Sequence, residues 1–343
     1  MRTEHDVPFA DLTTLRLGGP ARRLVVAESD EEIVETVRDA DTRGEPLLVL
    51  GGGSNLVVGD AGFDGTVLQL ATRGLAVAPL AEHALQVEAG VDWDHVVALT
   101  VDEGYAGIEA LSGIPGRVGA APIQNVGAYG QEVAQTVGWV RVLDRTTHDV
   151  VLLDPSDCGF GYRTSIFKAY PDRYVVLAVA FALKHSRDGV PIRYAELARA
   201  LGVEVGARVP SSDVREAVLA LRRAKGMVLD PADPDTCSAG SFFTNPLLDP
   251  AAADRLPEDA PRWPERAGRV KTSAAWLIEH AGFTKGYGTG SARISTKHTL
   301  ALTNRGGATT ADLLALAREV RDGVRARFDV ELVNEPVLLG DTL

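Results

Sequence analysis

Two glycine-rich segments hold the residues whose types and spacing most directly indicate chemistry. The first, Gly51-Gly52-Gly53-Ser54-Asn55, comes directly after the apolar run Leu47–Leu50. Successive glycines let neighbouring backbone N–H groups converge on an anion such as a phosphate. The same five residues also suit a tight turn between two strands, so this segment alone leaves both interpretations open.

This first segment does not match the common nucleotide-binding motifs. The Rossmann pattern G-x-G-x-x-G would need a third glycine at the position of Leu56. A P-loop would need a Lys-Ser or Lys-Thr pair after the glycines, and none follows. If the segment binds a phosphate, it must do so in a different backbone arrangement.

The second segment is more distinctive. Between positions 104 and 130 the chain holds seven glycines and two prolines, including Gly113-Ile114-Pro115-Gly116 and Gly119. Gln124 and Asn125 follow and offer an amide donor and acceptor each. The stretch is too apolar for a disordered linker and too rich in glycine for a helix. We expect an ordered loop, which either binds a ligand or packs on itself as an Ω-loop.

Regular elements must position these loops. Leu24–Ala27 is expected to be a strand, and Ser29 begins an S-x-x-E capping pattern for a helix that ends near Thr42, before Gly44. Leu47–Leu50 and Leu56–Val58 are apolar enough for strands on either side of the first glycine segment. A strand, a helix and a strand in so short a stretch are typical of a βαβ unit.

The same signals place elements along the rest of the chain. Val214, Val218 and Leu221 recur at helical spacing before a stop at Gly226. Further expected elements are the strands Thr66–Leu70, Leu85–Ala89, Tyr174–Leu183, His298–Thr303 and Val330–Leu339, the hairpin Val137–Leu143 with Asp149–Leu153, and helices over Asp92–Glu103, Ser212–Lys225, Ala274–Ala281 and Ala311–Phe328, with Tyr194 opening a short helical stretch.

Composition excludes several classes of function. The formal net charge of -12 disfavours binding to nucleic acid or to an anionic membrane through the general field of the protein. Cys158 and Cys237 form no CxxC pair, and the histidines lack ligand spacing, so we expect no disulfide framework and no metal site. No apolar stretch suggests a signal peptide or a membrane span, and we expect a cytoplasmic protein.

Five motifs together resemble one enzyme family. GGGSN, SGIPGRVGAAPIQNVGAYG, GYRTSIFK, AGSFFTNP and the terminal NEPVLLG occur in the order seen in the UDP-N-acetylenolpyruvoylglucosamine reductases. The resemblance covers essentially the whole chain, and its glycine-rich second motif and GSFFTNP are the most specific parts. These flavoenzymes complete UDP-N-acetylmuramic acid for peptidoglycan.

The resemblance implies an α+β protein with an FAD-binding fold of the vanillyl-alcohol-oxidase type. Two α+β subdomains, about 1–70 and 71–210, would hold FAD, 211–330 would form a C-terminal α/β substrate domain, and 331–343 would return to the flavin. The implied FAD contacts are Gly51, Gly52, Gly53, Ser54, Asn55, Gly113, Ile114, Pro115, Gly116, Gly119, Gln124 and Asn125. Neither glycine-rich segment contains a histidine, so we expect the flavin to be non-covalent.

Three residues match the family's catalytic positions. Reduction of an enolpyruvyl ether adds hydride to the terminal carbon, and negative charge develops on the neighbouring carbon and its carboxylate. The reaction therefore needs a hydride donor, stabilisers of charge and an acid. The resemblance implies that Ser241 is the acid, that Arg163 stabilises charge, and that Glu335 assists when protonated or bridged by a donor. Without the family context each would be read as an ordinary structural or solvated side chain.

Other residues match positions that hold the nucleotide sugar. Lys225, Asn245 and Lys285 are implied substrate contacts, and Tyr194 occupies the place of a tyrosine-bearing loop found in one branch of the family. Asn334 departs from the proline expected before the catalytic glutamate. NADPH is the implied co-substrate and shares one site with the nucleotide sugar. We expect a monomer.

Two other classes remain open from the residues. An FAD-dependent alcohol or hydroxy-acid oxidase would use the same fold, but GSFFTNP would then have no role. A nucleotide-sugar binding protein without flavin is opposed by the intact glycine-rich segments. Anaerobic NADPH would bleach the flavin of the reductase and not that of an oxidase, and a colourless protein that FAD cannot reconstitute would favour the binding protein.

Overall fold

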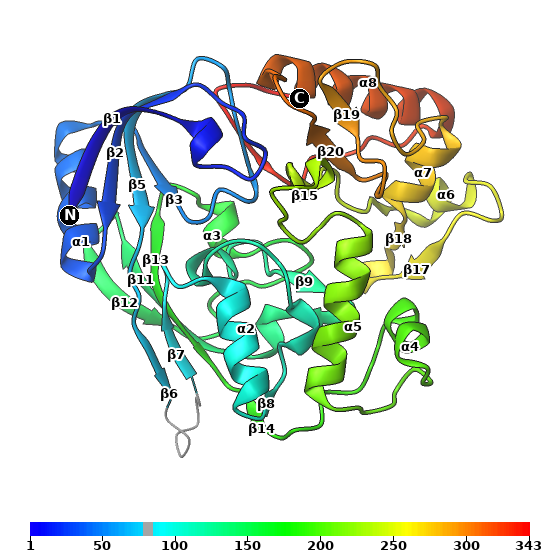
Figure 1. Cartoon of the computed structure of the whole chain (residues 1–343), viewed down its shortest axis with the longest axis horizontal. Coiled ribbons are helices and arrows are strands. Elements are labelled where there is room, and N and C mark those ends of the chain that lie inside the picture. The colour runs from blue at the N-terminus through cyan, green and yellow to red at the C-terminus, as the bar shows by residue number, and fades with distance from the viewer. Residues whose placement is uncertain (78–84) are drawn as a thin grey trace. The chain divides into compact units, whose positions relative to one another are not determined.

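The computed structural model describes residues 1–77 and 85–343 (Figure 1). The chain forms two compact units, each built from separated segments. Unit 1 comprises Met1–Asp6, Ala21–Gly52 and Asp64–Ala224. Unit 2 comprises Val7–Pro20, Gly53–Phe63 and Lys225–Leu343. Each unit is described by itself below.

Unit 1 begins with a four-stranded sheet of order β1-β2-β5-β3. Its strands are Arg2–Pro8 (β1), Pro20–Ala27 (β2), Leu47–Leu50 (β3) and Phe63–Leu70 (β5), and β3 runs parallel to β5. Helix α1 spans Asp30–Arg43. Ser29 accepts a hydrogen bond from the Glu32 amide at its N-terminus, and Gly44 ends it in the left-handed conformation. The expected strand–helix–strand order is confirmed, although β5 lies between β2 and β3 in the sheet.

A second, five-stranded sheet of unit 1 has the order β12-β11-β13-β7-β6. Its strands are Leu75–Val77 (β6), Leu85–Glu88 (β7), Val137–Asp144 (β11), Asp149–Leu153 (β12) and Tyr174–Phe181 (β13). The predicted hairpin is confirmed as the antiparallel pair β11–β12. Both sheets of unit 1 contribute to one hydrophobic core, in which Val25 and Leu68 lie with Val87 and Phe181.

The helices of unit 1 follow the predicted positions closely. They are Trp93–Asp102 (α2), Ile166–Ala169 (α3), Ala195–Leu201 (α4) and Ser211–Ala224 (α5), with short strands at Tyr105–Ala106 (β8), Gly127–Ala128 (β9), Gln131–Glu132 (β10) and Lys184–His185 (β14). Helices α2 and α5 lie side by side (Figure 1). Asp92 caps α2 through the His95 amide, as the sequence predicts.

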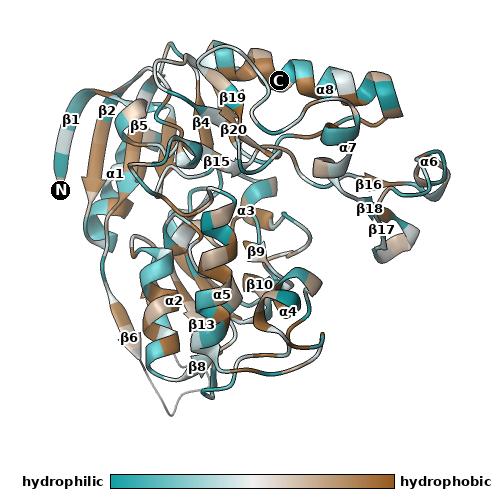
Figure 2. Cartoon of the chain, turned by 45° about the vertical axis from the view of Figure 1, so that its right-hand side comes forward, coloured by the Kyte–Doolittle hydropathy of each residue, from teal (hydrophilic) through white to brown (hydrophobic). Residues whose placement is uncertain are grey.

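Unit 2 holds three small sheets and three helices. Its strands are Leu56–Val58 (β4), Ser238–Ser241 (β15), Leu247–Leu248 (β16), Arg262–Pro264 (β17), Val270–Thr272 (β18), Ala292–Ile294 (β19), Ala301–Asn304 (β20) and Val337–Leu339 (β21), and its helices are Pro250–Asp254 (α6), Ala274–His280 (α7) and Thr310–Phe328 (α8). Strand β21 pairs in parallel with β4, which lies almost 280 residues earlier. Helix α8 is amphipathic: its ribbon carries both hydrophobic and hydrophilic residues (Figure 2), and its buried residues recur at helical spacing.

The two units divide the chain differently from the predicted boundaries. Helix α5 belongs to unit 1, although residues 211–330 were expected to form the C-terminal domain. Segments 7–20 and 53–63 belong to unit 2, although both were expected in the FAD-binding domain. The core of unit 2 explains this placement, because Leu15, Leu17 and Val57 are buried among residues of the C-terminal part. The functional roles assigned to the domains stay predictions.

Candidate functional site

The two glycine-rich segments approach each other within unit 1. The backbone of Gly52 lies so close to that of Gly116 that a methyl group on Gly52 would come within 2.8 Å of the Gly116 Cα atom. A methyl group on Gly51 would meet Arg117 at an ordinary 3.5 Å. Side chains larger than hydrogen therefore cannot occupy the contact at Gly52 without moving backbone.

The second glycine segment lies along the chain that leads into α2. The amide of Val118 donates to Val91 O at 2.9 Å, and that of Gly119 donates to Ala89 O at 2.9 Å. A methyl group on Gly119 would come within 2.6 Å of the Ala89 Cβ atom. The glycine spacing therefore permits close packing on this strand end as well as contact with Gly52.

Several amides of these loops are available to a ligand. Among the residues that the structure describes, the N–H groups of Gly51, Gly52, Ile114 and Gly116 have no hydrogen-bond acceptor. The amide of Gly53, a buried residue of unit 2, also lacks one within the described chain. Backbone donors that the fold leaves without acceptors suit the oxygens of a diphosphate. The residues present therefore fit a cofactor that carries a diphosphate.

Gly113 makes a contact that the sequence did not reveal, while its role in FAD binding stays a prediction. Its amide donates to Asp94 Oδ1 at 2.6 Å, and Arg215 binds the same carboxylate through two nitrogens at 2.6 and 2.9 Å. Burial opposes the charge of Asp94, but the bonds from Arg215 and Gly113 outweigh it and hold the pKa of this carboxyl below its usual value. Asp94 thus fixes one end of the glycine loop to α5.

Asn125 is used inside the protein. Its Nδ2 atom donates to Glu132 Oε2 and to Gly161 O, both at 3.0 Å, and its Oδ1 accepts from the Ala134 amide at 3.0 Å. The residue is buried and has a positive φ of 47°. All hydrogen-bonding capacity of the side-chain N–H groups is therefore committed to the loop, and a role of Asn125 in cofactor binding stays a prediction, as does that of Gln124, which is half-buried beside it.

This loop positions Arg163. The guanidinium donates to Gly127 O at 2.6 Å and to Asn125 O at 3.4 Å, and lies 5.4 Å from the centre of the Tyr162 ring. Lys168 donates to the Arg163 carbonyl at 3.1 Å, and Ser165 caps the short helix α3. Arg163 is half-buried and held in place on several sides, as a residue that stabilises charge requires.

Ser241 and Glu335 are brought together within unit 2. Ser241 ends strand β15, and its neighbour Phe242 accepts a hydrogen bond from the Glu335 amide at 2.8 Å. An antiparallel bridge between Phe243 and Asn334 continues the pairing. Asn55 supports the same segment, because its side chain donates to Glu335 O at 3.4 Å and its carbonyl accepts from the Val337 amide at 3.0 Å. The departure at Asn334 thus leaves Glu335 in a paired, half-buried segment.

The predicted substrate residues differ in setting. Tyr194 precedes α4, is exposed, and packs edge-on against Tyr129 in unit 1, with ring centres 5.7 Å apart. Burial raises the pKa of Tyr129 to about 12. In unit 2, Asn245 accepts from the Ala274 amide at 3.0 Å and so caps α7, whereas Lys225 is half-buried and Lys285 is exposed. The substrate roles of these residues stay predictions.

Arg222 is a further buried group that the sequence analysis missed. It lies two helical turns after Arg215 on α5, and both face the side where Asp94 and Tyr129 exert charge effects. Burial lowers the pKa of this guanidinium. The seven-residue spacing of the two arginines on an amphipathic helix was the available signal.

The described residues contain neither a metal-binding cluster nor a helix that could span a membrane. The described residues contain no group of three or more His, Cys, Asp and Glu side chains placed to bind a metal ion. No helix within residues 1–77 and 85–343 combines the length and apolar character needed to span a bilayer. Burial raises the pKa of the Cys158 thiol to about 12, which makes it a poor nucleophile.

Comparison with known families identifies the class. The model of an FAD binding domain matches residues 21–151, and the model of the C-terminal domain of UDP-N-acetylenolpyruvoylglucosamine reductase matches residues 231–339. The chain is therefore an FAD-dependent oxidoreductase, and FAD is its cofactor. The predicted α+β fold, with an FAD-binding domain and a C-terminal domain, is confirmed.

Whole-chain relatives give the family. A UDP-N-acetylenolpyruvoylglucosamine reductase of Thermobifida fusca is 61% identical and covers 98% of both chains. One from Streptomyces coelicolor is 60% identical over 99% of this chain and 91% of its own length. The crystal structure of such a reductase from Thermus caldophilus matches with a TM-score of 0.70 and 27% identity over 99% of both chains. This chain belongs to the UDP-N-acetylenolpyruvoylglucosamine reductase family, as its motifs indicated.

Proposed function

We propose that this chain oxidises NADPH and reduces UDP-N-acetylglucosamine enolpyruvate to UDP-N-acetylmuramate in peptidoglycan precursor synthesis, as a cytoplasmic monomer. Relatives that are 61% and 60% identical over nearly the whole chain carry the name of this reductase. The structural observation that supports the chemistry most directly is the hydrogen bond from the Glu335 amide to Phe242 O, which brings Glu335 next to Ser241.

The glycine-rich loops are proposed to hold the cofactor. The amides of Gly51, Gly52, Ile114 and Gly116 would donate to the diphosphate of FAD, since no acceptor in the described chain uses them. When bound, FAD supplies the hydride that reaches the terminal carbon of the enolpyruvyl group. Asp94 and Arg215 keep the second loop in place by binding the Gly113 amide.

The protein's own side chains would then handle charge and proton. Ser241 would donate its hydroxyl proton to the carbon next to the substrate carboxylate, because that carbon becomes strongly basic after hydride addition. The fork of Arg163 suits the carboxylate on which negative charge develops. Glu335 would assist in protonated form or through a bridging donor, since a bare carboxylate there would repel the developing charge.

Substrate binding needs positive charge in a protein with a net charge of -12. We propose that Lys225 and Lys285 neutralise the diphosphate of the nucleotide sugar, and that Asn245 and Tyr194 contact its remaining parts. The T-shaped packing of Tyr194 on Tyr129 offers a way to hold the tyrosine-bearing loop in position. NADPH would use the same site before the substrate enters.

Ser241→Ala tests the proposed acid. The variant is expected to bind FAD and to be bleached by NADPH at the normal rate. Reoxidation of its flavin by the enolpyruvyl substrate should slow by about 10²–10³-fold, as for loss of one positioned donor. Anaerobic stopped-flow absorbance separates the two half-reactions. Ser212→Ala, at an exposed serine of α5, is the matched control. Reoxidation at the normal rate in Ser241→Ala would remove Ser241 from the mechanism.

A further inference from the structure

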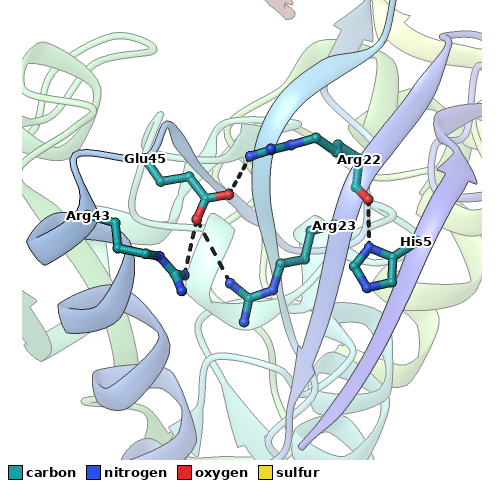
Figure 3. A pocket seen from close by; sticks show the side chains of 5 residues that line it. All are labelled: His5, Arg22, Arg23, Arg43 and Glu45. Atoms are coloured by element: carbon teal, nitrogen blue, oxygen red, sulfur yellow. Dashed lines mark hydrogen bonds and ion pairs between the residues drawn. The ribbon is translucent and has the colours of Figure 1, made fainter.

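A hollow of about 480 Å³ on unit 1 is lined by basic side chains that the proposed reaction does not use (Figure 3). His5 comes from β1, Arg22 and Arg23 from β2, Arg43 from the end of α1, and Glu45 from the turn that follows. None of the five belongs to the glycine-rich loops or to the predicted substrate residues. The three guanidinium groups lie around the Glu45 carboxylate, whereas Nδ1 of His5 lies 3.2 Å from Arg22 O.

Glu45 is the centre of this cluster. Its carboxylate is 14% exposed and accepts from Arg22 Nη2 at 2.6 Å and from Arg43 Nη2 at 3.1 Å. Figure 3 shows Arg22 and Arg23 of β2 and Arg43 of α1 converging on the two Glu45 oxygens. One half-buried carboxylate thus holds three positive side chains around the hollow.

Arg23 has the fewest close hydrogen-bond partners among the three arginines of this cluster. Its Nη1 atom lies 3.9 Å from the nearest oxygens of both Glu45 and Asp39, beyond hydrogen-bond distance. Its hydrogen bond to Thr66 Oγ1 is long, at 3.4 Å. Among the residues that the structure describes, nothing accepts from its Nε or Nη2 atoms. These donors remain available although the side chain is only 24% exposed.

Two further carboxylates lie beside these arginines. Asp64 lies 3.0 Å from Arg22 Nε and is 92% exposed, and Asp39 pairs with Arg43 at 2.7 Å and is 44% exposed. The three carboxylates match the three arginines in formal charge, and because Arg22 and Arg43 are 53% and 46% exposed, water and salt screen both signs of charge alike. What the hollow keeps in excess is hydrogen-bond donors, namely the Nε and Nη2 atoms of Arg23.

We propose that His5, Arg22, Arg23 and Arg43 form a second anion site, which binds a phosphate group. Guanidinium forks match phosphate oxygens in two-point contacts. The anion needs at least two negative charges, because it must compete with the Glu45 carboxylate for the same arginines. Since the side chains come from β1, β2 and α1, a bound phosphate would hold these three elements together.

The test uses the full-length holoenzyme with saturating FAD, so that the glycine-rich loops are occupied. Inorganic phosphate is titrated at constant ionic strength, balanced with chloride, and the unfolding midpoint is followed by differential scanning calorimetry. We expect the midpoint to rise and saturate. Arg23→Gln should weaken the apparent affinity about tenfold or more, as for loss of a charge-assisted donor. Arg2→Gln, on β1 outside the hollow, should bind phosphate like wild type.

Glu45→Gln provides the opposite and sharper test. Removal of the competing carboxylate should tighten phosphate affinity about tenfold, although the variant itself unfolds at a lower temperature. A purely structural arginine–glutamate cluster would lose stability without any gain in phosphate affinity. That result, or a phosphate response that Arg23→Gln leaves unchanged, would overturn the proposal.

Two further ligands distinguish the source of the phosphate. Inorganic diphosphate and ADP carry the same terminal group, but only ADP offers a nucleoside. Only the part of each midpoint shift that Arg23→Gln removes is compared, because the proposed nucleotide-sugar site also binds diphosphates. If that part is larger for diphosphate, the hollow binds free phosphates, and if it is larger for ADP, the hollow binds a nucleotide. A wild-type midpoint that none of the three ligands raises in an Arg23-dependent way would contradict the site.

Discussion

Gly52 determines how closely the two glycine-rich loops can approach. Gly52→Ala would place a methyl group 2.8 Å from the Gly116 Cα atom. This atom belongs to the backbone, so it cannot rotate away as a flexible side chain could. We expect the loops to separate and the affinity for FAD to fall by at least tenfold. Flavin content after gel filtration and fluorescence titration of the apoprotein with FAD measure the effect.

Gly290→Ala is the control for this change. A methyl group on Gly290 has open space within 4 Å, and its backbone does not require glycine. This variant should retain FAD like wild type. If Gly52→Ala also retained FAD with unchanged affinity, the contact between the loops would have no part in cofactor binding.

A separate prediction concerns the Asn125 side chain, which bonds within the loop whose Asn125 and Gly127 carbonyls accept from Arg163. Asn125→Ala removes three hydrogen bonds and leaves Gly161 O and the Ala134 amide without their partner. We expect the free energy of unfolding to fall by roughly 2–4 kcal/mol. Urea denaturation followed by circular dichroism measures it. An unchanged midpoint would show that water replaces the amide at no cost.

Side-chain amides explain why the site was only partly predictable at the residue scale. Asn125 and Asn245 were predicted to bind ligands, and the structure shows in addition that Asn125 bonds within its loop and that Asn245 accepts from the Ala274 amide at the start of α7. An amide can pair with backbone or with a ligand equally well, and the sequence carries no sign of which partner is near. The close contacts of the glycines were easier to predict, because few other residues fit where two backbone segments approach each other.

At the scale of elements, Asp94 links α2, the second glycine loop and α5. Its pKa is lowered in the folded protein, so the unfolded chain binds more protons over the range between the two values. Its contribution to stability is therefore complete above the unfolded value of about 3.9 and is lost as the pH falls through the lower folded value. Acid should loosen this link in particular.

Asp94→Asn tests the link. Urea midpoints at pH 7 and pH 3 should differ less in the variant than in wild type, because the variant lacks this titration. Asp102→Asn changes an exposed carboxylate at the end of the same helix and should keep the wild-type difference. An equal pH dependence in Asp94→Asn and wild type would mean that other carboxylates dominate the acid response.

Local sequence signals predicted the positions of helices and strands well, but they did not predict which elements pair in the fold. The Ser29 cap, Gly44 stop and strand Leu47–Leu50 were placed correctly because each depends on neighbouring residues only. The parallel pairing of β4 with β21 joins residues 281 positions apart, and nothing near Leu56 indicates it. The same holds for Asp94 and Arg215, whose ion pair depends on the packing of α2 against α5.

At the scale of the whole molecule, the chain alternates between its two units. Segment 53–63 supplies β4 as the partner of β21, and Asp60 accepts from the Thr310 and Ala311 amides at 2.8 and 3.0 Å. Asn304 donates to Leu15 O and Arg16 O in segment 7–20. The predicted boundaries at about residues 70, 210 and 330 do not group these segments with the C-terminal part, because their core contacts lie far away in sequence.

A truncation tests this interdependence. The fragment 225–343 lacks β4, the Asp60 cap of α8 and the buried residues Leu15, Leu17 and Val57. We expect it to show no cooperative thermal transition by calorimetry, whereas the full-length chain should show one. A cooperative transition of the isolated fragment would mean that residues 225–343 fold without segments 7–20 and 53–63.

The interleaved segments also constrain the order of events during synthesis. Residues 53–63 are synthesised about 160 residues before Lys225, which at about 5–20 residues per second is roughly 8–32 s, and residues 7–20 are synthesised earlier still. During this interval Leu15, Leu17 and Val57 have no C-terminal core to enter. The nascent chain therefore exposes these apolar side chains to chaperones until the C-terminal part of unit 2 has been synthesised.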